Sequence, residues 1–465
     1  MNKLRNEIES YLISNSNKIK INSRDIKEGD VFCALEGSSS HGNEYIIDAL
    51  GNGAKYIFTD KKWNKNLNNN ILKVKNSFDF LNSVAIKKRN HFKGKVIAIT
   101  GSIGKTSIKE YLNFFLLTSL QGKISASIKS YNNLLGTLLS LINMNLNSKY
   151  SIFEVGTSNF GEIRKLASLI LPEQVIITNI TPTHLENFKN TRNIAIEKSD
   201  LFNPKYNPYI KLLVLSNNNT DELYLQKIAK QNNIQSIITY GDTKKSNYFI
   251  KNIKKINNIT SKITYVTPKK TINIEAFTIL KHEILNLQIP LIIFNYNKLP
   301  IKDFISNIRK IPTIYGRGSY HFINLNYRLV KLINESYNAS PASMLNCINY
   351  FSEIELKEYQ RKILILGEML ELGQKSSLFH KEVILEALHK SIDFIVFCGS
   401  KYKRILSKLN LSLKNVFYFE NEFKIIDFLN KNIQKNDIIL AKGSNSSQVN
   451  KLVNLLLKIE IKREK

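Results

Sequence analysis

The chain has 465 residues, of which 43% are hydrophobic and 23% are charged, so its composition is not that of a disordered or fibrous protein. Because one hydrophobic core rarely serves a chain of this length, we expect two or three domains. The formal net charge is +29, but the lysines are spread along the whole chain without a long basic block. We therefore interpret the charge as a solvated basic surface, compatible with an anionic small substrate, and predict no nucleic-acid partner.

The cysteines and the hydropathy pattern indicate a reduced, cytoplasmic environment. Cys33, Cys347 and Cys398 lie far apart and form no CxxC pair, so neither a disulfide framework nor a zinc site is predicted. Residues 1–13 are amphipathic and contain acids, unlike a secretory signal peptide. No apolar run reaches the roughly 18 residues needed to cross a bilayer. We expect a cytoplasmic protein that is not inserted in a membrane.

Three α/β regions follow one another along the chain. Residues 1–86 hold short strand-like runs separated by turn and helix patterns, which predict a small α/β domain. Between residues 87 and 316, apolar strands alternate with helical patterns, so we expect a mostly parallel sheet with crossover helices. Residues 317–465 show the same alternation and predict a third, Rossmann-like domain. Its apolar runs lie at 362–366, 394–397 and 437–441.

The stretch Val96–Glu110, VIAITGSIGKTSIKE, is an apolar strand that meets a glycine-rich loop and continues as a helix. This order is typical of a phosphate-binding loop, because glycines let backbone N–H groups approach the oxygens at a helix N-terminus. Ile99 stands where the longer form of the motif has its first glycine. We expect Lys105 to neutralise the β- and γ-phosphates and Thr106 to ligate Mg²⁺. The predicted nucleotide-binding residues are Thr100, Gly101, Ser102, Gly104, Lys105, Thr106 and Ser107.

The next two apolar strands also end in chemically active residues. Glu154 closes one of them, at the sheet edge where ligands of open α/β folds bind, and its carboxylate suits the same Mg²⁺ as Thr106. His184 follows the second through a proline-containing loop, and Lys198 lies early in the helical pattern after it. Nucleotide binding by itself leaves a kinase, an ATPase, a transporter subunit or a ligase open.

These residues resemble the Mur ligases, the ATP-dependent amide-forming enzymes of peptidoglycan assembly, and within that family the MurF branch. The resemblance covers nearly all 465 residues in collinear order. The loop motifs SYNASPASM and GEMLELG favour this branch over its sister ligases. The stretches that carry the resemblance are Ser23–Arg24, Gly29–Gly37, Thr100–Ser107, Tyr131–Gly136, Glu154–Gly156, Thr183–Phe188, Asn334–Met344, Leu366–Gly373 and Lys442–Ser444.

The resemblance implies a reaction and a division of labour among the domains. Residues 1–86 would bind the uridine nucleotide of a UDP-muramyl-peptide, residues 87–316 would bind ATP, and residues 317–465 would complete the ligase site. The implied reaction joins D-alanyl-D-alanine to UDP-N-acetylmuramoyl-tripeptide through an acyl phosphate. Its product would be UDP-N-acetylmuramoyl-pentapeptide, made by a monomer that works on small molecules. The third residue of the acceptor peptide is left open between meso-diaminopimelate and lysine.

The resemblance also implies roles for single residues. Ser23 and Arg24 would contact UDP, and Asn132 and Asn133 would line the muramyl-peptide channel. Lys198 corresponds to a lysine that CO₂ carbamylates in the family. The residues expected to reach ATP when the third domain closes are Arg317, Glu335 and Asn338. The implied catalytic residues are Lys105, Glu154, His184 and Lys198, with one Mg²⁺ on Thr106 and Glu154 and a second on His184 and carbamylated Lys198.

Some positions depart from the usual pattern of the branch. Asn334 and Glu335 stand where aspartates are common, Ser340 where asparagine is usual, and Asn445 where arginine is usual. These departures leave an inactive paralogue open as an alternative. Two others are a related ligase, of another Mur type or resembling folylpolyglutamate synthase, and a basic nucleic-acid-binding NTPase. The amine that supports phosphate release from ATP distinguishes among the ligases. Stimulation of the ATPase activity by polynucleotide would identify the NTPase.

Overall fold

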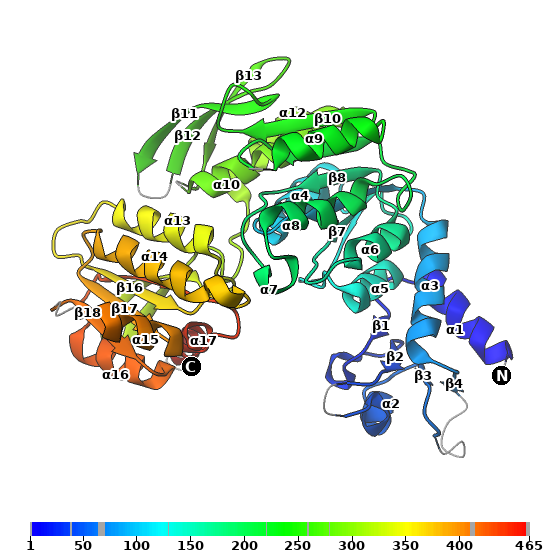
Figure 1. Ribbon diagram of the computed structural model, residues 1–465. Coiled ribbons are helices and arrows are strands. Elements are labelled where there is room, and N and C mark those ends of the chain that lie inside the picture. The colour runs from blue at the N-terminus through cyan, green and yellow to red at the C-terminus, as the bar shows by residue number, and fades with distance from the viewer. Residues whose placement is uncertain are drawn as a thin grey trace.

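The structure is a computed structural model that describes residues 2–37, 40–63, 70–128, 130–219, 221–257, 260–278, 280–409 and 414–461. It forms three α/β units, each built on its own sheet. Figure 1 shows them as an arch, with the central unit at the top and the N- and C-terminal units at its two lower ends. Within the described residues, no helix is long and apolar enough to cross a membrane.

The N-terminal unit is a four-stranded parallel sheet in the order β1-β2-β3-β4. Its middle strand β2, with the sequence VFCA, is buried at every position, as expected of a strand covered on both faces. The elements are α1 (Asn2–Ser14), β1 (Ile19–Lys20), η1 (Ser23–Asp25), β2 (Val31–Ala34), η2 (Gly42–Tyr45), α2 (Ile46–Gly51), β3 (Tyr56–Thr59), β4 (Ile71–Lys73) and α3 (Ser77–His91).

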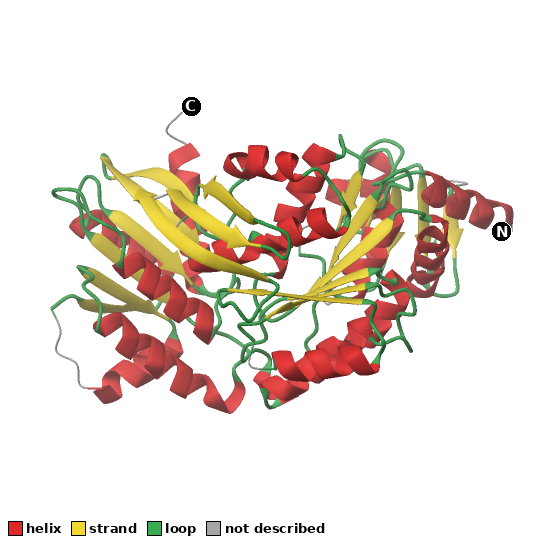
Figure 2. Ribbon diagram, turned by 90° about the horizontal axis from the view of Figure 1, so that it is seen from above, coloured by secondary structure: helices red, strands yellow, loops and turns green. Residues whose placement is uncertain are grey.

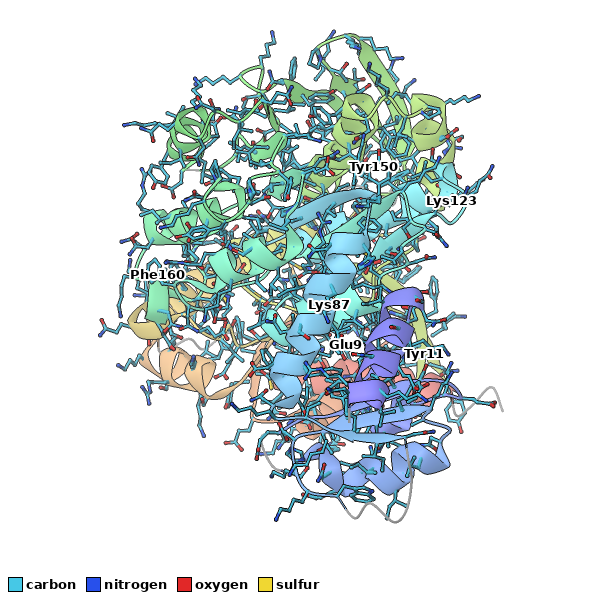
Figure 3. All side chains as sticks on the ribbon, turned by 90° about the vertical axis from the view of Figure 1, so that its right-hand side faces the viewer. Glu9, Tyr11, Lys87, Lys123, Tyr150 and Phe160 are labelled. Atoms are coloured by element: carbon cyan, nitrogen blue, oxygen red, sulfur yellow. The ribbon has the colours of Figure 1, made fainter. Side chains whose placement is uncertain are left out.

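Helix α3 ties the N-terminal unit to the central unit. The buried Lys88 amine donates to three carbonyl oxygens at the end of α1, at 2.7 to 2.9 Å. The next residue, Arg89, donates to the carbonyls of Ile170 and Leu171 in the central unit. Each cation thus satisfies the free carbonyls at a helix C-terminus, where positive charge is favourable. Figure 3 shows Glu9 and Lys87 where α1 and α3 run side by side.

The central unit is a nine-stranded sheet in the order β13-β12-β11-β10-β9-β8-β5-β7-β6. Figure 2 shows helices on both sides of its strands. The elements are β5 (Lys95–Thr100), α4 (Lys105–Ser119), β6 (Ile124–Ala126), α5 (Leu134–Asn143), β7 (Tyr150–Glu154), α6 (Glu162–Ile170), β8 (Gln174–Ile177), α7 (Leu185–Phe188), α8 (Thr191–Ser199), η4 (Asp200–Phe202), β9 (Leu212–Ser216), α9 (Glu222–Gln231), β10 (Ser236–Gly241), β11 (Tyr248–Asn257), β12 (Thr260–Val266), β13 (Thr271–Ala276), α10 (Lys281–Asn286), α11 (Gln288–Tyr296), α12 (Ile301–Asn307) and η5 (Ile308–Lys310).

The strands from β6 to β11 are parallel, as the sequence pattern predicts, whereas β12 runs in the opposite direction. β12 pairs antiparallel with both β11 and β13. The physical reason is the length of the connections, because the few residues between these strands are too short for the crossover that a parallel pair requires. In Figure 1 these three strands extend from the top of the central unit.

The C-terminal unit is a six-stranded sheet in the order β14-β15-β19-β16-β17-β18, parallel except for the β14–β15 hairpin. Separate apolar clusters cover its two faces. The elements are β14 (Ser319–Leu325), β15 (Arg328–Glu335), α13 (Pro341–Ser352), β16 (Lys362–Gly367), η6 (Gly373–Lys375), α14 (Ser376–Leu388), β17 (Phe394–Cys398), α15 (Ser400–Leu409), β18 (Val416–Phe419), α16 (Glu422–Asn432), β19 (Ile438–Lys442) and α17 (Gln448–Ile461).

The predicted fold class is confirmed: three α/β domains, with a mostly parallel central sheet and a Rossmann-like C-terminal domain. The exact limits of the domains stay predictions. Residue 86 lies inside α3, and one apolar cluster continues from α1 through α3 into the central helices α5 and α6. The N-terminal and central domains therefore share a core at this point.

Asn143 at the end of α5 provides a test of that shared core. Its buried side chain accepts from the Ile19 N–H at 3.0 Å and donates to the Ile19 carbonyl at 3.2 Å, in β1 of the other domain. We expect Asn143→Ala to lower the free energy of unfolding by about 2 to 4 kcal/mol, because two buried backbone groups lose their partners. Urea denaturation followed by circular dichroism measures the change.

The matched control is Asn147→Ala, a nearby exposed asparagine. Its effect should stay within about 0.5 kcal/mol, as for most surface substitutions. Equal effects of the two variants would show that the Asn143 contacts do not stabilise the domain interface.

Candidate active site

A glycine-rich loop joins β5 to α4 at the carboxyl edge of the central sheet. Gly101 has a φ of 146°, and a Cβ at this position would overlap the Thr178 hydroxyl at the end of β8. Gly104, with a φ of 87°, lies in the left-handed region immediately before α4. The Thr178 hydroxyl also donates to the carbonyl of Ile103 at 2.6 Å. Glycine is therefore required where the loop passes closest to the neighbouring strand.

Lys105, the first residue of α4, folds its side chain over this loop. Its Nζ donates to the carbonyl oxygens of Gly101 at 2.7 Å and Ser102 at 3.2 Å. Burial lowers the pKa of Lys105; the nearby Glu154 raises it and Arg317 lowers it further. The amine thus lies beside the N-terminus of α4, where backbone N–H groups and the helix dipole favour an anion such as a phosphate.

Thr106 and Glu154 form a pair of oxygen donors next to the loop. Glu154 ends β7 directly opposite Ile99 of β5, and its Oε2 accepts from the Thr106 hydroxyl at 2.8 Å. The other carboxylate oxygen accepts from Asn132 Nδ2 at 2.9 Å. Both donors are hard oxygens beside a phosphate-binding loop, so this pair fits Mg²⁺. Among the described residues, no cluster of three or more His, Cys, Asp or Glu is arranged to hold a metal ion.

An arginine from the segment between the central and C-terminal domains reaches this pair. Arg317 Nη2 donates to Thr106 Oγ1 at 3.1 Å, and its guanidinium lies 4.8 Å from the centre of the Tyr337 ring. It is flanked by Gly316 and Gly318, both with φ above 70°, which turn the chain sharply at this point. Arg317 therefore joins the two domains at the phosphate loop.

The C-terminal domain contributes its own cation and carboxylate. Glu335 and Lys442 are register partners at the ends of the parallel strands β15 and β19. Lys442 Nζ lies 3.3 Å from Glu335 Oε2 and donates to the carbonyl of Asn338 at 3.0 Å. Lys442 is only 2% exposed, so this buried charge is held by both partners.

His184 and Lys198 lie on the other side of the loop. Lys198 on α8 is 3% exposed, and its Nζ donates to Thr100 Oγ1 at 3.4 Å. Burial lowers the pKa of Lys198 well below its ordinary value, and the charge of Lys105 adds to this effect while Glu197 opposes it. Burial also lowers the pKa of His184. Both groups are therefore shifted toward the neutral forms that bind a metal or react with CO₂.

Two cavities meet at the loop. One, of about 370 Å³, runs from the loop between α10 of the central domain and α13 of the C-terminal domain. The other, of about 310 Å³, is lined by His184, Lys198 and the loop after β16. The residues that line both are Ser102, Lys105, Asn132 and Asn338. The two cavities therefore adjoin at Lys105.

Models of three domains match the chain in order. They are the Mur ligase family catalytic domain over residues 16–93, the Mur ligase middle domain over 99–293, and the Mur ligase glutamate ligase domain over 323–445. The UDP-N-acetylmuramoyl-tripeptide–D-alanyl-D-alanine ligase of Rickettsia prowazekii (strain Madrid E) is 32% identical, over 94% of this chain and 95% of the relative. The chain belongs to the Mur ligase family.

Solved structures of Mur ligases share the fold. MurF from Acinetobacter baumannii superposes with a TM-score of 0.78 at 21% identity, covering 95% of this chain and 93% of that one. A MurF ligase from Thermotoga maritima in complex with ADP has a TM-score of 0.77 at 23% identity, covering 97% and 99%. The predicted membership of the family, closest to MurF, is confirmed.

The structure brings most of the predicted Mur ligase site together and leaves three predicted residues apart from it. All predicted residues of the loop lie near the two cavities. The other predicted residues found there are Asn132, Glu154, His184, Lys198, Arg317, Glu335 and Asn338. Ser23 and Arg24 lie in η1 of the N-terminal domain, where the Ser23 carbonyl accepts from Asn52. Asn133 caps α5, its side chain accepting from the Gly136 N–H. Their predicted contacts with UDP and the muramyl-peptide stay predictions.

The sequence gives no local signal for the contacts that several residues of this Mur ligase site make. Lys442 lies in a short motif, but nothing local in the sequence shows that β19 lies beside β15 and brings Lys442 to Glu335. Tyr337, whose hydroxyl donates to Ser130 at 2.5 Å, and His282 and Asn286 of α10 also line the larger cavity. A conserved pattern in related chains is the signal that would have found them.

The glycine requirement in the loop is testable. We expect Gly101→Ala to weaken ADP binding by at least 100-fold, because the new Cβ overlaps Thr178 and displaces the loop. Isothermal titration with ADP and Mg²⁺ measures the affinity. The control is Gly122→Ala, which has a similarly unfavourable φ of 85° but open space around it. Similar ADP affinities for the two variants would contradict the steric argument.

Proposed function

We propose that this protein joins D-alanyl-D-alanine to UDP-N-acetylmuramoyl-tripeptide with the hydrolysis of ATP, as a monomer in the cytoplasm. The product is UDP-N-acetylmuramoyl-pentapeptide for peptidoglycan. The observation that carries the proposal is the pair of cavities that meet at Lys105, one suited to a nucleotide and the other to an acceptor carboxylate. The relative named above, which matches nearly the full length, bears the name of this activity.

The reaction needs ATP because a carboxylate does not expel hydroxide at neutral pH. A carboxylate oxygen of the tripeptide attacks the γ-phosphorus, the bond to the β-phosphate oxygen breaks, and ADP leaves. The amine of D-alanyl-D-alanine then attacks the acyl phosphate, loses a proton, and expels inorganic phosphate from the tetrahedral intermediate. Three anionic groups must be held together, so positioned positive charge provides most of the catalysis.

The larger cavity supplies the nucleotide site. Lys105 and the N–H groups of the loop are placed to bind the β- and γ-phosphates, and Arg317 reaches the same point from the domain junction. Thr106 and Glu154 would hold one Mg²⁺. Glu335 and Asn338, held by Lys442, close the other side of the cavity and exclude water from the acyl phosphate.

The smaller cavity supplies the acceptor site. His184 and carbamylated Lys198 would hold a second Mg²⁺, and the neutral amine favoured by burial is the form that reacts with CO₂. When bound, the two ions supply positive charge to the γ-phosphate and to the acceptor carboxylate. Ser340 and Asn445, two of the departures from the usual pattern, line this cavity and are placed to contact the incoming dipeptide.

The remaining departures have a structural account. Asn334 is fully buried in β15, where its Oδ1 accepts from the N–H and the hydroxyl of Ser336. Glu335 keeps a carboxylate at the cavity and pairs with Lys442. The carboxylate kept by Glu335 at the cavity favours an active ligase over an inactive paralogue.

Phosphate release tests the proposal directly. With ATP and Mg²⁺, release should require both UDP-N-acetylmuramoyl-tripeptide and D-alanyl-D-alanine, and Lys105→Ala should lower it by at least 100-fold. The comparison amines are D-alanine and L-glutamate, and a separate reaction contains polynucleotide in place of both substrates. Release with another amine would reassign the substrate, polynucleotide-stimulated release would support an NTPase, and no release in any mixture would contradict a ligase.

Carbamylation of Lys198 has its own test. With ¹³C-labelled bicarbonate, the wild-type protein should show a carbamate carbon signal by NMR that is missing in Lys198→Ala. The same signal should persist in Lys165→Ala, because Lys165 lies on the neighbouring helix α6 and lines neither cavity. An unchanged spectrum in Lys198→Ala would place the carbamate elsewhere or exclude it.

A further inference from the structure

A contact between a histidine and a carboxylate joins the central and C-terminal domains at the smaller cavity. His184 Nδ1, just before α7, lies 2.7 Å from Glu371 Oε2, in the loop between β16 and η6. The two side chains are 30% and 61% exposed. The pair is therefore partly shielded from water on the His184 side and open on the Glu371 side.

Both partners have a backbone conformation that non-glycine residues rarely adopt. The φ angle is 50° at His184 and 60° at Glu371. A left-handed conformation is unfavourable for an L-residue, so it persists only where the surrounding structure requires it. The loop is also fitted to α7 at Gly373, where a Cβ would lie 2.9 Å from Glu186 Cγ. Two strained residues from different domains thus meet at one contact.

The two nitrogens of the His184 imidazole have different surroundings at this contact. Because Nδ1 faces the carboxylate, Nε2 is the nitrogen left to bind a metal. Metal-binding histidines usually carry a carboxylate or carbonyl on their second nitrogen, which sets the ring orientation and raises the basicity of the ligating nitrogen. The charged groups that act on His184 are Glu371, Lys105, Lys198 and Glu162. Glu371 is the member of this set that comes from the C-terminal domain.

We propose that Glu371 is a positioning residue that orients His184 for metal binding only when the C-terminal domain is docked. The inference rests on the proposed function, since His184 is there assigned as a ligand of the second Mg²⁺. Docking of the C-terminal domain then completes the acceptor-side metal site at the moment when Glu335 and Asn338 cover the nucleotide. Phosphoryl transfer is thereby confined to the closed, water-excluding arrangement.

Glu371→Gln tests this coupling, because it keeps the shape of the side chain and removes its charge. Mn²⁺ binding is measured by electron paramagnetic resonance with a non-hydrolysable ATP analogue and no peptide substrate. The wild-type protein should bind two Mn²⁺ ions. In Glu371→Gln, we expect the weaker-bound ion to lose about 10- to 100-fold in affinity, the usual effect of removing such a carboxylate, while the other ion is unchanged. In phosphate release, kcat should fall while the KM for ATP stays the same.

Glu353→Gln is the matched control. Glu353 also contacts the central domain through an ion pair, with Lys255 at 3.5 Å, and its side chain is 66% exposed. This variant should keep both Mn²⁺ affinities and kcat. Equal behaviour of the two variants would reduce the Glu371 contact to a surface ion pair and overturn the proposal. A wild-type protein that binds one Mn²⁺ would also overturn it, whereas phosphate release dependent on both substrates would still support the proposed function.

Discussion

The need to hold several cations close to Lys105 is the constraint on which the site depends. Lys105, Arg317 and Lys442 all line the larger cavity, because the triphosphate, the acceptor carboxylate and the oxyanion that forms from it are all negatively charged. Like charges at short range repel, and burial adds a desolvation cost for each of them. The structure offsets this with acceptors matched to each cation. Lys105 rests on loop carbonyls, Arg317 on Thr106 and the Tyr337 ring, and Lys442 on Glu335 and Asn338.

The three domains are joined in two different ways. The N-terminal and central domains share an apolar cluster and the buried polar contacts of Lys88, Arg89 and Asn143, so their connection is close to that of a single core. The C-terminal domain has its own two clusters and meets the central domain mainly through polar pairs, with Phe379 as an apolar contact. Polar interfaces within a chain generally permit relative domain motion. The C-terminal domain is therefore the part suited to open and close over the nucleotide.

The positions of the polar pairs between the central and C-terminal domains link domain closure to the chemistry of the site. Arg317, Tyr337 and Glu371 each contact a central-domain residue at the edge of one of the two cavities. The same contacts that dock the domain therefore also arrange the groups that act on the substrates. The backbone strain at His184 and Glu371 is consistent with this, since strained residues concentrate where an arrangement is needed for function.

The sequence predicts some features of this protein better than others. The glycine-rich loop, the ends of β7 and β8 and the alternation of strands and helices are local patterns. They were sufficient for the fold class and for the expectation that Lys105, Thr106, Glu154 and His184 lie near one another, whereas the roles of these residues stay predictions. The sequence does not predict the antiparallel pairs of β12 with β11 and β13, because the alternating burial of these strands says nothing about strand direction.

The sequence by itself determined the glycine-rich loop between β5 and α4, because its glycines, lysine and threonine are contiguous and its conformation follows from backbone sterics. Only the tertiary structure decided that Glu335 and Lys442 are neighbours, that Arg317 reaches Thr106, and that Glu371 meets His184. These pairs are separated by more than a hundred residues, and their meeting depends on strand order and domain docking. Both arise from packing over the whole chain, which no local pattern of residues records.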